Sequence, residues 1–76
     1  MTIKEANFPF DVGIAKLIQK KGVKQVYIAD KAGYTAQELS DMLNGRKIIK
    51  LCDVPRLAGA LGVEIDAIYS AGEESE

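Results

Sequence analysis

Histidine is absent from this 76-residue chain, and cysteine occurs once, at Cys52. Zinc sites usually need about four Cys or His ligands, so the composition argues against a zinc centre. It also excludes a catalytic triad that uses histidine and a disulfide within the chain, and nothing in the sequence calls for a cofactor. Cys52 lies between the apolar residues Leu51 and Val54. We therefore expect it to be a small buried apolar residue.

Long apolar segments are missing as well. No run of about 18 apolar residues could cross a membrane, and the first ten residues, MTIKEANFPF, lack the pattern of a secretory signal. We therefore expect a cytoplasmic protein with no membrane partner. A chain of this length makes one small domain, residues 1–76, which favours a binding module over an enzyme. Neither convergent carboxylates nor a phosphate-binding glycine loop is visible, and no small-molecule substrate is suggested.

Basic residues are concentrated in the middle of the chain. Residues 16–50 contain eight Lys or Arg and three acidic residues, which gives this segment a charge of +5. Residues 51–76 contain one Arg and six acidic residues, and the whole chain has a net charge of −1. Since the local field matters more than the total charge for binding, nucleic acid is a plausible partner.

Hydrophobic periodicity predicts an all-α fold, a compact bundle of five short helices, because apolar residues recur three and four positions apart. The first predicted helix is capped by Asp11 and ends at Gly22, the second covers residues 24–32 and the third covers residues 36–43. A fourth includes residues 56–61 with Asp53 as its cap, and a short last helix of about two turns includes Ile65, Ile68 and Tyr69.

Both ends of the chain lack a clear period. We expect residues 1–9 to form an N-terminal arm whose Phe8, with Phe10, folds back onto the core. The acidic tail, residues 71–76, is expected to be disordered because it contains few groups that could be buried.

The segment from Gln25 to Asn44 predicts two helices joined by a tight turn. Gly33 can end the first helix in a left-handed conformation, and Ala29 and Ala32 are small enough for close helix packing. Thr35 and Glu38 form a capping box, in which each side chain bonds the backbone amide of the other, so the second helix should begin at Ala36. This is the helix-turn-helix arrangement, which places its second helix in the DNA major groove.

Side chains at the start of that second helix could read base edges. Gln37 could pair with adenine, Ser40 could donate or accept, and Ala36 could only contact a thymine methyl group. Asp41 would be repelled by phosphates unless it accepts from cytosine or pairs with a lysine, and it could act as a filter against wrong sites.

Several pieces of the sequence occur at the spacing of one known family. They are Gln25, residues 29–33 (ADKAG), Leu39, residues 44–47 (NGRK) and residues 57–63 (LAGALGV). The chain resembles the lambda-repressor-like, Cro/CI-type (XRE) helix-turn-helix family over roughly residues 14–69. Lys24, where the family often has a capping Ser or Thr, and Pro55, which lies deeper in its helix than usual, depart from the pattern.

The resemblance implies sequence-specific binding of a double-stranded DNA operator with two-fold symmetry, usually by a homodimer. It implies base contacts from Thr35, Ala36, Gln37, Ser40 and Asp41. It implies phosphate contacts from Gln25, Asn44, Arg46 and Lys47, and we expect the neighbouring Lys24 and Lys50 to add to them. The leading interpretation is a transcriptional repressor of prophage or mobile-element type.

Apolar residues outside the predicted core leave a second interpretation open. Val26 and Tyr27 either pack under the N-terminal aromatic residues or form a contact surface, which would suit a protein-interaction module such as an antitoxin or antirepressor. The predicted dimer interface lies on the last helix and consists of Ile65, Ile68 and Tyr69, although core packing explains Ile65 and Ile68 equally well.

Overall fold

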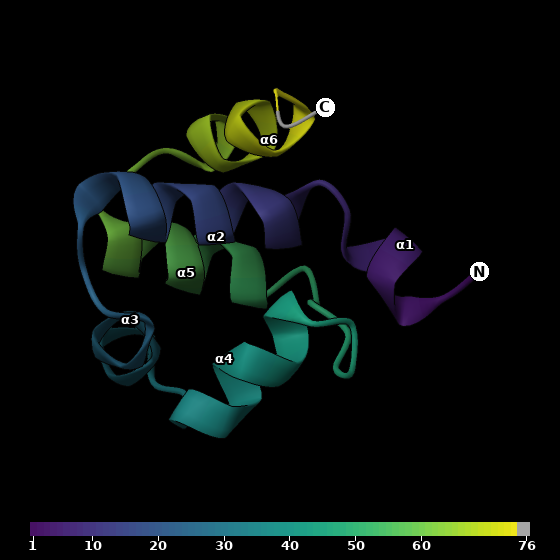
Figure 1. Cartoon of the computed structure of the whole chain (residues 1–76), viewed down its shortest axis with the longest axis horizontal. Coiled ribbons are helices and arrows are strands. Elements are labelled where there is room, and N and C mark those ends of the chain that lie inside the picture. The colour runs from purple at the N-terminus through teal and green to yellow at the C-terminus, as the bar shows by residue number, and fades with distance from the viewer. Residues whose placement is uncertain (75–76) are drawn as a thin grey trace.

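The computed structural model describes residues 1–74, and these form six α-helices and no strand (Figure 1). The helices are α1 (Ile3–Asn7), α2 (Phe10–Lys21), α3 (Gln25–Ala32), α4 (Ala36–Leu43), α5 (Asp53–Leu61) and α6 (Ile65–Glu73). The predicted all-α class is confirmed, with one helix more than expected. No helix in the described part of the chain is long and apolar enough to span a bilayer.

The core is built from the apolar stripes of α2 to α6. One large side chain from each of these helices is almost completely buried: Ile14, Ile28, Leu39, Leu57 and Ile68. Burial of each such side chain stabilises the fold by roughly 1.5–3 kcal/mol. In Figure 1, α2 crosses the middle of the molecule between α6 and α5, while α3 and α4 lie together at the opposite end from α6.

Two glycines allow α2 and α6 to approach closely. A Cβ atom at Gly13 would overlap the carbonyl oxygen of Ile68, and one at Gly72 would overlap the carbonyl oxygen of Pro9. The backbones of the two helices are therefore in direct contact, and Ile68 is fully buried between them and the core. This corrects the prediction of Ile68 as an interface residue, because it has no surface with which to meet a partner.

The expected N-terminal arm is wrong for residues 3–7, which form α1. Thr2 caps this helix through the same reciprocal bonds with Glu5 that the sequence predicts for Thr35 and Glu38. Asn7 is buried, whereas Phe8 is half exposed and does not fold back onto the core. Only Phe10 does so, with its ring 5.6 Å from that of Tyr69 in an edge-on contact.

Three further expectations are corrected near helix ends. Helix α2 begins at Phe10, so Asp11 is buried in the first turn instead of capping it. Cys52 is exposed, because it lies in the turn that precedes α5. The tail expected to be disordered continues α6 as far as Glu73, and its residues 75 and 76 lie outside the described part.

Candidate nucleic-acid interface

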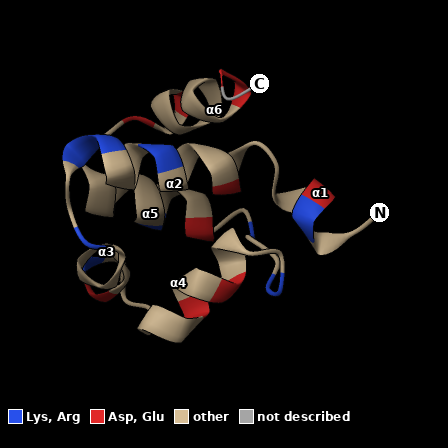
Figure 2. Ribbon diagram, in the orientation of Figure 1, with Lys and Arg blue, Asp and Glu red and all other residues tan. Residues whose placement is uncertain are grey.

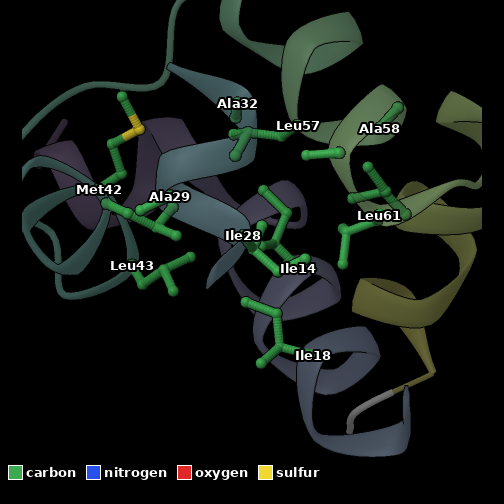
Figure 3. Close-up of a cluster of buried hydrophobic side chains, with 13 residues drawn as sticks. Ile14, Ile18, Ile28, Ala29, Ala32, Met42, Leu43, Leu57, Ala58 and Leu61 are labelled. Carbon is green, nitrogen blue, oxygen red and sulfur yellow. The ribbon is translucent and has the colours of Figure 1, made fainter. Parts of the chain in front are cut away.

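The turn between α3 and α4 has the geometry that the sequence predicts. Gly33 adopts a left-handed conformation with φ of 90°, which side chains with a Cβ rarely adopt. The amide of Tyr34 donates to the carbonyl oxygen of Ala29 at 2.8 Å and closes the end of α3. Ala29 is completely buried and faces Met42 and Leu43 of α4 (Figure 3). Small residues thus let the two helices pack closely.

Helix α4 begins at Ala36, as the capping box predicts. The Glu38 amide donates to the Thr35 hydroxyl at 3.0 Å, and the Thr35 amide donates to the Glu38 carboxylate at 2.8 Å. These two bonds satisfy amides that would otherwise lack partners at the helix start. The first turn of α4 is therefore held in one conformation while its outer side remains open.

The predicted base-facing residues form a strip that begins at the N-cap of α4 and continues one turn along the helix. Thr35, Ala36 and Gln37 are exposed, and Ser40 and Asp41 are partly buried one turn further along the helix. The strip thus presents a methyl group, an amide, hydroxyls and a carboxylate.

Asp41 is paired with two of its neighbours. Its Oδ1 atom accepts from Gln37 Nε2 and from Arg46 Nε, each at 2.9 Å. The hydrogen bond from Arg46, followed by the one from Gln37, lowers the pKa of the Asp41 carboxyl below its ordinary value. Arg46 therefore takes the role that the sequence analysis gave to a lysine, and it offsets the repulsion between this carboxylate and phosphate.

The predicted phosphate-facing residues come from two places. Lys24 and Gln25 are exposed at the start of α3, where no side chain caps the helix and the first amides remain available to an anion. Asn44 follows α4, and its Nδ2 atom donates to the Ser40 carbonyl oxygen at 2.7 Å. A phosphate contact by the Asn44 amide nitrogen therefore competes with this bond.

The remaining predicted phosphate contacts lie in residues 46–50, which we call the basic loop. Arg46 and Lys50 are exposed and Lys47 is partly buried. The amides of Arg46 and Lys47 both donate to the Asp41 carbonyl oxygen, at 2.8 and 3.1 Å, and fold the loop onto the end of α4. Figure 2 shows acidic but no basic segments on α4 itself, with basic segments on the adjoining loop and around the end of α2 and the start of α3. The cationic side chains near α4 therefore come from residues that flank this helix.

A cluster around Tyr34 joins the turn to the start of α5, and sequence reasoning missed it. The Tyr34 hydroxyl donates to Asp53 Oδ1 at 2.6 Å, and the Lys50 amide donates to Asp53 Oδ2 at 2.9 Å. The Arg56 guanidinium lies 5.2 Å from the centre of the Tyr34 ring. Asp53 therefore ties the turn and the basic loop together instead of capping α5 as predicted.

These contacts shift two pKa values in opposite directions. Burial, with the hydrogen bond to Asp53, raises the pKa of Tyr34 to about 12. Burial by itself would raise the pKa of Asp53, but the hydrogen bonds from Tyr34 and from the Lys50 amide outweigh it and lower that pKa. The cluster is thus most stable with a neutral phenol and an ionised carboxylate.

Residues 14–68 match a helix-turn-helix family of the XRE, Cro/CI type. The chain belongs to this family. The match covers more than half of the chain and includes the whole of α3, α4 and α5. No curated protein is similar enough to the chain to be matched. As a member of the XRE family the protein is a DNA-binding transcription regulator, and the family is not an enzymatic one.

The part of the chain before the XRE match also contacts the end of α4. Asn7 and Lys4 of α1 both donate hydrogen bonds to carbonyl oxygens at the end of α4. The sequence analysis missed these two residues because it assigned no structure to the first nine positions. The signal that could have found α1 was present, since Thr2-x-x-Glu5 is the same capping box that located α4.

Proposed function

We propose that this protein is a transcriptional repressor of prophage or mobile-element type, which acts in the cytoplasm by occupying a two-fold operator. The exposed start of α4 carries the proposal, because it presents Thr35, Ala36 and Gln37 outward on a helix whose first turn is rigidly capped. Cations also lie at the start of α3 and in the basic loop, on segments that precede and follow α4 (Figure 2). In this arrangement α4 reads bases while the flanking cations and amides hold the phosphates.

Selection of bound duplexes from a random pool tests this proposal and yields the operator. The logarithm of the binding constant should then fall linearly with the logarithm of the salt concentration, by about 0.9 for each phosphate neutralised. Affinity that does not change with salt would contradict a phosphate-based interface.

Two substitutions separate base reading from phosphate binding. Gln37→Ala should cost about 1–3 kcal/mol on the selected duplex and relax specificity at one base position. Lys47→Ala should weaken binding to selected and random duplexes alike. Gln19→Ala, at an exposed glutamine on α2, is the matched control and should leave specificity unchanged. Equal losses on both duplexes for Gln37→Ala and Lys47→Ala would refute the roles assigned to them.

A homodimer would match the two-fold operator, and α6 offers the proposed surface. Ile65 and Tyr69 are each exposed over about two fifths of their area, at 42% and 44%. Sedimentation equilibrium at increasing protein concentration measures the oligomeric state of the wild type. Ile65→Ser should shift the monomer–dimer equilibrium towards monomer. An unchanged equilibrium in this variant would place the interface elsewhere.

A second candidate function is supported by the exposed apolar residues of α3. Val26 and Tyr27 do not pack under the N-terminal aromatic residues, since 55% and 54% of their surfaces remain exposed. Such a pair suits contact with a partner protein, as in an antitoxin or antirepressor. Complete lack of binding to random duplex at low salt would favour this function over the repressor.

A further inference from the structure

The end of α4 is completed by residues from distant parts of the chain. The last four carbonyl groups of any helix have no partner within that helix. In α4 two of them are satisfied locally. The Ser40 carbonyl oxygen accepts from the Asn44 amide at 3.0 Å, and the Asp41 carbonyl oxygen accepts from the amides of Arg46 and Lys47. The carbonyl oxygens of Met42 and Leu43 remain to be satisfied.

Helix α1 supplies both of the missing donors. Asn7 Nδ2 donates to the Met42 carbonyl oxygen at 3.0 Å, and Lys4 Nζ donates to the Leu43 carbonyl oxygen at 3.1 Å. Helix α4 has no basic residue in its own last turn. Because the carboxyl end of a helix carries partial negative charge, Lys4 provides there a cation that α4 lacks. A segment outside the XRE match thus caps the helix that faces DNA.

Asn7 also fixes the basic loop. Its Nδ2 atom donates a second hydrogen bond to the Lys47 carbonyl oxygen at 3.0 Å, and its Oδ1 atom accepts from the Ile49 amide at 2.7 Å. The side chain is 1% exposed, and all three of its partners are backbone groups 35 to 42 positions away in sequence. One buried amide thereby joins the end of α4 to the loop that carries the phosphate-facing cations.

Lys4 is itself held in place from two sides. Its Nζ atom forms an ion pair with Asp11 Oδ2 at 2.9 Å, and the Asp11 side chain is fully buried. Its aliphatic stem lies against Gly45, where an added Cβ would come within 3.1 Å of Lys4 Cβ. Helix α1 is therefore packed onto α2, α4 and the residue that precedes the basic loop.

We propose that α1 is a brace for DNA recognition, in which Asn7 is the positioning residue for the basic loop and Lys4 secures the end of α4. This inference rests on the proposed function. By ordering Arg46 and Lys47 before DNA arrives, the brace removes part of the conformational entropy that binding would otherwise cost. Neither Asn7 nor Lys4 needs to touch DNA for this role.

The test compares Asn7→Ala with Ile18→Ala, a core variant in the last turn of α2, at the opposite end of that helix from α1. Both are assayed on the selected duplex at a temperature where circular dichroism shows each variant to be folded. Asn7→Ala should bind about tenfold more weakly than wild type, because two cationic side chains must be ordered during binding. Ile18→Ala should bind as wild type. Equal affinities of the two folded variants would overturn the brace.

A double-mutant cycle separates positioning from a purely structural role. In a background with Arg46→Ala and Lys47→Ala, the loss caused by Asn7→Ala should shrink to less than about threefold, because the cations that it positions are gone. The same loss in both backgrounds would overturn the proposal. The double variant Lys4→Met and Asp11→Asn leaves no buried unpaired carboxylate. Its loss of DNA affinity should also shrink in the background without Arg46 and Lys47, but by less than the loss caused by Asn7→Ala.

Failure of the brace and failure of the proposed function give different results. If wild type binds no duplex from the pool, the repressor function itself is wrong and the brace falls with it. If wild type binds and Asn7→Ala binds equally well, only the brace is wrong.

Discussion

Two glycines, each within a helix, should respond in opposite directions to the same substitution. Gly13 of α2 faces α6, where a Cβ would overlap the Ile68 carbonyl oxygen and lie 2.9 Å from the Ile68 carbonyl carbon and 3.1 Å from the Gly72 amide nitrogen. Gly59 of α5 is exposed and has no atom within 4 Å of an added Cβ. Gly13→Ala and Gly59→Ala therefore form a matched pair in which only the packing differs.

The magnitudes follow from two opposing effects. Alanine stabilises a helix interior by about 1 kcal/mol relative to glycine, and this gain is available at both sites. At Gly13 the added methyl group meets backbone atoms of α6, which cannot rotate away, and overpacking of this kind costs about 1–3 kcal/mol or more. We expect Gly13→Ala to lower the free energy of unfolding by about 2 kcal/mol and Gly59→Ala to raise it by about 1 kcal/mol.

Urea denaturation followed by far-ultraviolet circular dichroism measures both changes, provided that the slopes of the transitions agree. For a domain of this size, the difference of about 3 kcal/mol corresponds to melting temperatures roughly 12–24 °C apart. Shifts of the same sign and size for the two variants would refute the close contact between α2 and α6.

Substitutions at three other positions test separate features. Thr35→Ala should lower the free energy of unfolding by about 1 kcal/mol through loss of the capping box, whereas Thr35→Ser should retain most of this stability. Equal losses for the two variants would contradict a cap by the hydroxyl group. Because folding raises the pKa of Tyr34 from 10.0 to about 12, its contribution to stability is present below pH 10 and is lost as the pH rises to about 12. A difference in urea stability between wild type and Tyr34→Phe that stays constant across this interval would contradict the raised pKa of Tyr34. Asp41→Asn removes a negative charge next to Arg46, so it should tighten binding to random duplex. The ratio of the affinity for selected duplex to that for random duplex should therefore fall. An unchanged ratio would contradict a role for Asp41 in discriminating against wrong DNA sites.

The parts of the interface that sequence reasoning predicted correctly depend on short-range interactions. The Thr35 cap reaches only three residues along the chain, and Gly33 ends α3 through bonds to the preceding turn. Helical periodicity likewise predicted the helices whose apolar faces bury Ile14, Ile28 and Leu39, because an amphipathic helix buries one face. Fold class, the boundaries of α4 and the XRE resemblance could all be predicted from such local patterns.

The errors concern residues whose environment is set by distant segments. Phe8 and Cys52 are apolar residues that the fold leaves exposed, and composition alone could not show that no neighbour covers them. Ile68 is buried while Tyr69 next to it remains half exposed, and only the packing of α6 on α2 selects which of these two residues faces inward. Periodicity shows that a helix has an apolar face, but it does not show which partner covers that face.

The sequence by itself determined a small all-α protein with an XRE-type helix-turn-helix, because helix starts, helix ends and the glycine turn depend on neighbours within a few residues. The tertiary structure decided how that motif is supported. Asn7 meets its three backbone partners, and Tyr34 meets Asp53, only after the chain has folded. Hydrogen bonds between residues so far apart in sequence produce no periodic pattern, since Asn7 and Tyr34 are single polar residues whose environment depends on the whole fold.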